Sequence, residues 1–186
     1  MAAWKQAARA ELADTCKDAS YAQCLLDLVK AFDRVPYHVL VREAAALGYP
    51  LWILRLSIST YTCDRVIRVE GVVSEVFKAK RGITAGSGLA TAEMRIVMIR
   101  IVDQASQIAP AVVPTLFVDD LSVEAAGGCK FVEKAIVTFK QSACQAIGRD
   151  CMEVSKTKSV CTASDNKLGR VIAEQLGDFG TNIRGL

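Results

Sequence analysis

Three aspartates stand among apolar residues, where a bare carboxylate is costly to bury. Asp27 interrupts the apolar run 25–29, and Asp119 and Asp120 separate the apolar residues 116–118 from Leu121. A buried carboxylate needs a partner, and few cations lie near these acids in the sequence. Carboxylates without histidine or thiolate are typical ligands of Mg²⁺ or Mn²⁺. Two such ions can activate an attacking hydroxyl and stabilise a leaving phosphate oxygen, which is the chemistry of nucleotidyl transfer.

Each acidic motif alone has a simpler interpretation. Asp27 would end a strand, and Asp119 with Asp120 would form an ordinary turn. The metal site is favoured only if the fold brings the two motifs to one sheet edge.

The elements around the acids predict such a fold. Hydrophobic periodicity and turn residues predict helices over 3–17, 37–47, 50–61, 89–99, 132–147 and 165–176, and strands over 21–29, 67–78 (a hairpin turning at Gly71), 115–118, 121–125 and 158–163. With the hairpin set aside, the order is β-α-β-β-α-β. It predicts an α+β fold of the split βαβ (ferredoxin-like) type, an antiparallel sheet with helices on one face and an inserted β-hairpin. In that plan the strand of Asp27 can lie beside the hairpin of Asp119 and Asp120.

Two details of these elements are also predictions. The strand before the acids is expected to become regular only at Thr115, because Pro114 has no N–H to give to a central strand. The helix that begins near residue 89 is expected to bury one apolar face, which consists of Leu89, Ala92, Ile96 and Ile99.

Composition limits the class of protein. The chain has 186 residues, which suits one domain, and its 52% of hydrophobic residues excludes a disordered chain. This apolar fraction is more than a self-contained soluble domain needs, so we expect part of the surface to be covered by another component. The net charge of +3 permits a nucleic-acid partner without arguing for one.

Cysteine and histidine usage narrows the chemistry further. Seven cysteines occur without a CxxC pair, which predicts buried free thiols in a reducing compartment, the nucleus or cytoplasm. His38 is the single histidine, so a multi-histidine metal site is excluded. Charged residues and prolines break the longest apolar stretch, residues 94–118, and no membrane segment is expected.

Four segments resemble the catalytic motifs of reverse transcriptases from non-LTR retrotransposons and group II introns. Residues 25–40 (LLDLVKAFDRVPYHVL) resemble the first motif, and residues 81–90 (RGITAGSGLA) resemble the glycine-rich second motif. Residues 117–120 (FVDD) match the aromatic-x-Asp-Asp third motif. Gly148 with residues 154–158 (VSKTK) is similar to the fourth. The motifs follow the family order and cover residues 21–163.

The resemblance implies a role for each matched residue. Asp27 and Asp119, with the backbone carbonyl of Leu28, would ligate two Mg²⁺ ions (or Mn²⁺), and Asp120 would be the third carboxylate. Phe32 would be a steric gate whose ring excludes a ribose 2′-OH, and Gly82 would let the backbone pass close to the nucleotide. The implied nucleotide-binding residues are Leu28, Ala31, Phe32, Arg81, Gly82 and Lys156.

Simpler interpretations stay open for some of these residues. Phe32 could be a core aromatic, and Lys156 a solvated lysine before a strand. Asp33 and His38 fit the family pattern as helix-start and packing residues. In the second motif, Arg81 and Ala85 replace the usual glutamines.

The resemblance also implies a domain organisation. Residues 1–20 would be a helix from the fingers side, 21–163 the palm, and 164–186 a helix and tail leading toward a missing thumb. The implied partners are an RNA template, a DNA primer, deoxynucleoside triphosphates and the remainder of a larger retroelement polyprotein.

The sequence therefore predicts the palm of an RNA-directed DNA polymerase, which adds deoxynucleotides to a primer 3′-OH and needs fingers and thumb for activity. One alternative is an inactive retroelement-derived remnant that binds nucleic acid or protein. Another is a different split-βαβ enzyme, such as a nucleotidyl cyclase or an RNA-dependent RNA polymerase palm.

Overall fold

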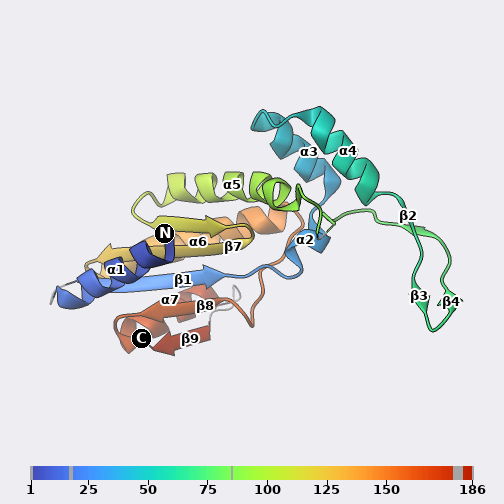
Figure 1. Ribbon diagram of the computed structural model, residues 1–186. Coiled ribbons are helices and arrows are strands. Elements are labelled where there is room, and N and C mark those ends of the chain that lie inside the picture. The colour runs from blue at the N-terminus through green and yellow to red at the C-terminus, as the bar shows by residue number, and fades with distance from the viewer. Residues whose placement is uncertain (1, 17–18, 85, 178–181, 186) are drawn as a thin grey trace. The chain divides into compact units, whose positions relative to one another are not determined.

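The main sheet of the protein has the strand order β6-β7-β1-β8-β9 (Figure 1). The computed structural model describes residues 2–16, 19–84, 86–177 and 182–185. The strands are β1 (Ser20–Leu26), β6 (Val113–Phe117), β7 (Asp120–Gly127), β8 (Val160–Ala163) and β9 (Asn182–Gly185). The first four in space pair antiparallel, which confirms the predicted combination of an antiparallel sheet with helices. Strand β9 pairs parallel with β8 and was not predicted.

The edge strand β6 corrects one expectation. It begins at Val113, and Pro114 lies inside it, opposite Val123 of β7. The prediction of a regular strand only from Thr115 was wrong because β6 lies at the edge of the sheet, where proline's missing N–H interrupts no second ladder.

One face of the sheet carries the core of this part of the chain. Ala22, Cys24 and Leu26 of β1 are fully buried on it. Helix α6 (Cys129–Arg149) covers this face and also packs against α7 (Asn166–Leu176). The residues predicted to point inward from α6 are all buried: Val132, Ala135, Ile136, Phe139, Ala143 and Ile147.

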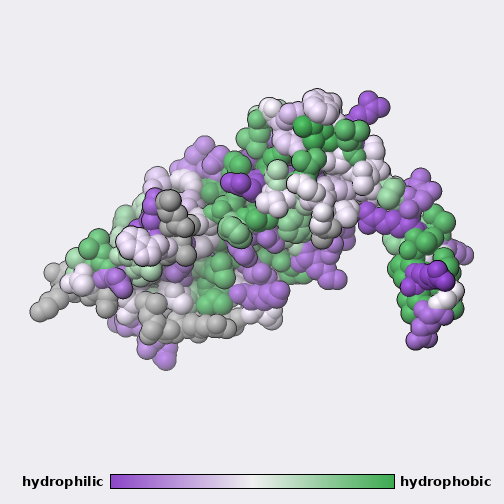
Figure 2. Space-filling view, viewed as in Figure 1, coloured by the Kyte–Doolittle hydropathy of each residue, from purple (hydrophilic) through white to green (hydrophobic). Residues whose placement is uncertain are grey.

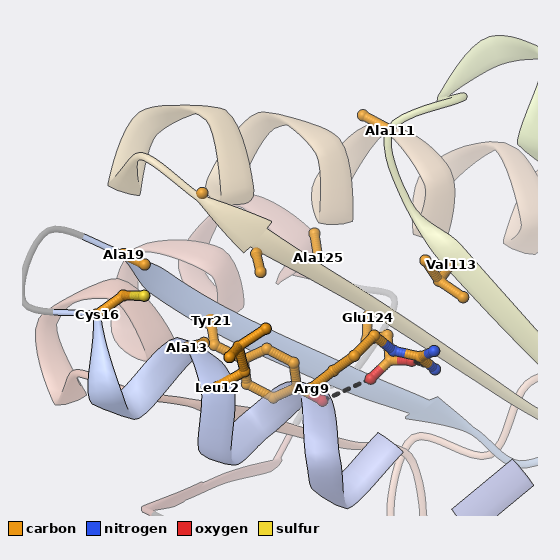
Figure 3. Close-up of a pocket in the computed structure, with 12 residues that line it drawn as sticks. Arg9, Leu12, Ala13, Cys16, Ala19, Tyr21, Ala111, Val113, Glu124 and Ala125 are labelled. Atoms are coloured by element: carbon orange, nitrogen blue, oxygen red, sulfur yellow. Dashed lines mark hydrogen bonds and ion pairs between the residues drawn. The ribbon is translucent and has the colours of Figure 1, made fainter. Parts of the chain in front are cut away.

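The opposite face carries helix α1 (Ala2–Thr15). Arg9 forms an ion pair with Glu124 of β7, and Gln6 donates a hydrogen bond to Ser122 Oγ at 3.1 Å. Tyr21 of β1 donates to the same Glu124 at 2.8 Å (Figure 3). Since alternate strand residues point to opposite faces, α1 and α6 lie on different faces. The prediction of helices on one face only was therefore wrong.

Residues 30–97 form a second compact unit, distinct from residues 1–29 with 98–186. Its elements are α2 (Ala31–Arg34), α3 (Tyr37–Ala46), α4 (Leu51–Tyr61), β2 (Asp64–Arg65), β3 (Arg68–Val69), β4 (Val72–Val73), β5 (Phe77–Lys78) and the first turns of α5 (Ala90–Ile108). The predicted division into 1–20, 21–163 and 164–186 stays a prediction.

The predicted inserted hairpin is present as a two-stranded ribbon. Strands β3 and β4 pair around Glu70 and Gly71, which both have positive φ, and β2 pairs with β5. The ribbon mixes hydrophobic and hydrophilic residues on its surface (Figure 2). Its exposed large apolar residues are Val66, Ile67, Val69, Val72, Val73, Val76 and Phe77.

Helix α5 has a different buried face from the predicted one. Leu89 and Ala92 are exposed and Ile99 is half-buried, so only Ile96 of the predicted face is buried. The buried residues of α5 are Ala90, Glu93, Met94, Ile96, Val97, Met98, Ile101 and Ala105. Apolar residues surround this helix on most sides, so hydropathy alone does not fix which side faces inward.

Two further predictions concern the burial of the cysteines and the absence of a membrane-spanning helix. All seven cysteines are free, but only Cys24, Cys144 and Cys161 are buried, so the prediction of buried thiols was wrong for the other four. Within the ranges given above, no helix is both long and apolar enough to cross a bilayer.

Candidate functional site

The strand register brings the three predicted acids to one end of the sheet. The last pairs of the ladders are Leu26 with Leu121, and Phe117 with Asp120. One more step along β1 sets Asp27 opposite Asp120, and Asp119 lies in the turn between β6 and β7. The pKa of the Asp120 carboxyl is raised by partial burial and by the negative charges of Asp119 and Asp27. Asp120 is therefore within electrostatic range of both other carboxylates.

The turn that carries Asp119 holds its neighbour in an unfavourable conformation. Only two residues, Val118 and Asp119, connect the paired Phe117 and Asp120. Val118 has φ +61°, a region in which a β-branched residue is strained by about 1–2 kcal/mol. Such outliers concentrate at functional sites, where the surrounding structure enforces them.

Asp27 is fixed through its backbone by the segment 153–159. Ser155 N–H donates to the Asp27 carbonyl at 2.7 Å, and Val29 N–H donates to the Glu153 carbonyl at 2.8 Å. The Asp27 N–H donates to Ser159 Oγ at 3.3 Å. These bonds frame an isolated bridge between Leu28 and Val154 that does not use the Leu28 carbonyl.

A lysine that was not predicted lies next to the acids. Lys158 Nζ is 3.7 Å from Asp27 Oδ2, a buried oxygen that accepts no hydrogen bond from the described part of the chain. The antiparallel register of β1 with β8 pairs Leu25 with Val160, so its continuation sets Lys158 opposite Asp27. Lys156, the predicted lysine, is exposed on the same loop. Lys158 ends the segment 154–158 that resembles the fourth motif, but nothing singled it out there, because its place beside Asp27 follows from a strand register that hydropathy does not specify.

The donor set suits a hard divalent cation in its chemistry. It offers three carboxylates and the backbone carbonyl of Leu28, which the bridge to Val154 does not use, without histidine or thiolate. As the side chains stand, however, no three acidic, histidine or cysteine side chains in the described ranges are arranged to hold a metal ion. A bound ion would need these carboxylates to turn toward one another.

The other predicted site residues lie in the unit of residues 30–97. Ile83 N–H donates to the Phe32 carbonyl and Gly82 N–H to the Val35 carbonyl, both at 2.8 Å. Gly82 has φ +99°, and a Cβ there would stand 2.9 Å from the Asp33 carbonyl oxygen. Only glycine fits this close approach, which joins the glycine-rich turn to the segment of Phe32.

The predicted residues thus fall into two groups, each assembled within its own unit. Asp27, Leu28, Asp119, Asp120 and Lys156 belong to the sheet unit, and Ala31, Phe32, Arg81 and Gly82 belong to the unit of residues 30–97. Ala31 is buried, Phe32 half-buried and Arg81 exposed, while Ala85 lies outside the described residues. His38 is exposed, so its predicted packing role was wrong.

A family model described as reverse transcriptase (RNA-dependent DNA polymerase) matches residues 6–171. The chain belongs to the reverse transcriptase family. The match includes both units and every predicted site residue, although it does not distinguish subtypes of reverse transcriptase. A search of curated proteins gave no match.

Solved telomerase structures have a similar fold. Apo telomerase from Candida tropicalis, truncated from its C-terminal domain, has a TM-score of 0.64 at 15% identity and covers 84% of this chain and 33% of its own. Telomerase from the same organism in complex with the TWJ fragment of telomeric RNA has a TM-score of 0.62 at 14% identity, covering 87% of this chain and 29% of its own. At such identities the likeness shows the fold alone. This chain spans about a third of the length of those telomerase chains.

Proposed function

We propose that this chain is the palm of a reverse transcriptase of the non-LTR retrotransposon or group II intron type. It would add deoxynucleotides to a primer 3′-OH, directed by an RNA template, with fingers and thumb supplied by other segments. One observation carries the proposal: the strand register, continued by one residue, sets Asp27 opposite Asp120, and Asp119 lies in the adjoining turn. Residues 21–163 would be the split-βαβ palm, flanked by 1–20 on the fingers side and 164–186 on the thumb side.

The proposed metal ligands are Asp27, Asp119 and the backbone carbonyl of Leu28, with Asp120 as the supporting carboxylate. Two Mg²⁺ ions, or Mn²⁺, would when bound activate the primer hydroxyl and stabilise the departing pyrophosphate. Partial burial raises the pKa of Asp120 most, and the negative charges of Asp119 and Asp27 add to the rise. This repulsion supports the assignment, because a cation among the acids relieves it. Lys158 would supply part of that positive charge beside Asp27 before the ions bind.

The proposed nucleotide contacts divide between sugar and phosphate. Phe32, next to Ala31, would face C2′ of the incoming nucleotide and exclude a ribose hydroxyl. Gly82 and Arg81 would approach the nucleotide through the glycine-rich turn, and Lys156 would lie near the triphosphate. The partners would be RNA template, DNA primer, deoxynucleoside triphosphates and the rest of a retroelement polyprotein.

A second candidate is a remnant that binds nucleic acid or protein without catalysis. The observation in its favour is the side-chain arrangement, in which no three potential ligands in the described ranges meet around one point. The replacement of the family's glutamines by Arg81 and Ala85 points the same way.

Primer extension on poly(rA)/oligo(dT) distinguishes the two candidates. The assay compares this chain with a longer chain that includes flanking fingers and thumb segments, each with Mg²⁺. We expect the longer chain to extend the primer, Asp27→Ala to abolish extension, and Asp103→Ala to retain it, because Asp103 is an exposed acid of α5. Two negative results together would establish the remnant. Neither chain would extend the primer, and Mg²⁺ would raise the melting temperature of the unsubstituted chain no more than that of Asp119→Asn.

A further inference from the structure

A buried tyrosine and a buried glutamate form a pair in the unit of residues 30–97. Tyr61, at the end of α4, is 1% exposed, and Glu93, in the first turn of α5, is 0% exposed. The Tyr61 hydroxyl donates to Glu93 Oε2 at 2.7 Å. Among the residues that the structure describes, none forms a hydrogen bond with Glu93 Oε1. Glu93 therefore depends on Tyr61 for its solvation inside the protein.

Tyr61 is connected twice to the glycine-rich turn, residues 81–88. Its hydroxyl lies 3.2 Å from Ser87 Oγ in a second hydrogen bond. Its backbone carbonyl accepts from Arg65 Nη2 at 2.9 Å, and the same nitrogen donates to Thr84 Oγ1 at 3.0 Å. The side chains of Ser87 and Thr84 are thus both held by the end of α4.

The first residues of the same turn hold the segment of Phe32. Ile83, which is 1% exposed, donates its N–H to the Phe32 carbonyl, and Gly82 donates to the Val35 carbonyl. Hydrogen bonds therefore lead from Glu93 through the Tyr61 hydroxyl to Ser87, and from the Tyr61 carbonyl through Arg65 to Thr84. The backbone of the turn connects both residues to Ile83, which donates to the Phe32 carbonyl.

We propose that Tyr61 and Glu93 are positioning residues, which hold the glycine-rich turn and, through the Ile83 amide, the backbone of Phe32, and so set nucleotide selectivity. Both side chains are buried, so neither touches a nucleotide. The effect on selectivity rests on the function proposed above for Phe32. The effect on the turn does not.

Amide hydrogen exchange of the full chain, followed by NMR, tests the effect on the turn. In Tyr61→Phe we expect the Ile83 amide to exchange about tenfold faster or more, while core amides of β1 keep their rates. Glu93→Gln should preserve most of the protection, because its amide oxygen still accepts from Tyr61. Tyr49→Phe is the matched control, since Tyr49 lies in the same unit within electrostatic range of Glu93. An unchanged Ile83 rate in folded Tyr61→Phe would overturn the proposal.

A milder variant keeps the test decisive if Tyr61→Phe does not fold. Thr84→Val removes the acceptor for Arg65 without changing the size of the side chain. It should accelerate exchange at Ile83 by a smaller factor, about threefold. The same rate as in the unsubstituted chain would refute the connection between α4 and the turn.

Nucleotide selectivity tests the remaining part in the longer chain of the extension assay. For Tyr61→Phe we expect the ratio of kcat/KM for dTTP over UTP to fall about tenfold, chiefly through KM for dTTP, with kcat little changed. An unchanged ratio would refute the effect on selectivity. No extension by the unsubstituted longer chain would refute the polymerase function and the selectivity with it, whereas the exchange rates decide the positioning role independently.

Discussion

The two compact units each contain a buried tyrosine that donates to a buried glutamate, and they compensate the glutamate differently. In the sheet unit Tyr21 donates to Glu124, and Arg9 of α1 forms an ion pair with the same carboxylate (Figure 3). In the unit of residues 30–97 Tyr61 donates to Glu93, for which the described residues provide no ion pair. One carboxylate is neutralised by a cation, and the other is held by hydrogen bonds alone.

This difference indicates what each pair does. The Arg9–Glu124 contact joins a helix to the open face of the sheet, so its contribution is the docking of α1. The Tyr61–Glu93 pair joins no additional element by charge, and its directional hydrogen bonds fix the position of a turn. An ion pair tolerates small changes of geometry, whereas a single short hydrogen bond to a buried carboxylate does not.

The largest expected effect comes from removing the cation of the first pair. Arg9→Met leaves Glu124 buried without a countercharge, which should lower the free energy of unfolding by about 3 kcal/mol in urea titrations. Arg9 is 36% exposed, so the loss is expected at the lower end of values for buried ion pairs. Lys5→Met, an exposed change on the same helix, should have little effect. A second substitution, Glu124→Gln, should restore most of the loss. If it does not, Arg9 stabilises the fold by packing and not by charge.

The second largest expected effect is a loss of folding stability at alkaline pH, caused by the Tyr61–Glu93 pair. Burial and the Glu93 carboxylate raise the pKa of Tyr61 from 10 to about 12. The unfolded chain therefore releases the tyrosine proton first as pH rises, and folding stability due to this group is full below pH 10 and lost between pH 10 and 12. By pH 11.5 the loss should be about 2 kcal/mol. Unfolding free energies measured from pH 9 to 11.5 should fall less steeply in Tyr61→Phe. Equal slopes would show that Tyr61 does not carry the shift.

Two glycines of the glycine-rich turn separate the energetic cost of a steric clash from the cost of an unfavourable backbone conformation. Gly82→Ala should destabilise the protein by about 2 kcal/mol, because the new Cβ meets the Asp33 carbonyl at 2.9 Å in addition to the strained φ. Gly86 also has a positive φ, +87°, but a Cβ there meets nothing within 4 Å. Gly86→Ala should therefore cost about 1 kcal/mol, the conformational part alone. Equal losses in thermal unfolding would mean that the Phe32 segment moves away without penalty.

Removing each tyrosine hydroxyl compares the two pairs directly. Tyr61→Phe should destabilise by about 2 kcal/mol and Tyr21→Phe by about 1 kcal/mol, because Glu124 keeps its bond to Arg9 while Glu93 loses its hydroxyl donor. Both values come from the same urea titrations. In the background of Arg9→Met the Tyr21→Phe loss should grow toward that of Tyr61→Phe. If the loss stays the same in that background, the contacts of Arg9 and Tyr21 with Glu124 contribute to stability independently.

Sequence reasoning could predict that the three acids lie at one end of the sheet, because the strands and the hairpin around them follow from local hydropathy and turn residues. The apolar run before Asp27 and the apolar residues around Asp119 and Asp120 predict a strand and a hairpin, and these are the elements observed. Lys158 could not be found in this way, because it faces Asp27 through a register between strands more than a hundred residues apart.

The buried face of α5 was missed for a related reason. Glu93 is charged, so hydropathy assigns it to the outside, yet a tyrosine from α4 solvates it within the protein. Pro114 was excluded from its strand because edge position is a property of the whole sheet and not of the local sequence. Long-range pairing therefore decides the features that the local patterns do not.

The smallest expected effect concerns two turns, one in each unit, which both have a residue with positive φ. The unit of residues 30–97 has Gly82 there, whereas the sheet unit has Val118 beside Asp119. Val118→Gly should raise the free energy of unfolding by about 1 kcal/mol, since glycine adopts φ +61° without strain and the greater entropy of the unfolded glycine offsets part of that gain. Val113→Gly, at the exposed start of β6, is the control and should be destabilising. If Val118→Gly is stabilising and yet lowers primer extension by the longer chain, the strain serves to hold Asp119 in place; unchanged extension would mean that the hairpin positions Asp119 without it.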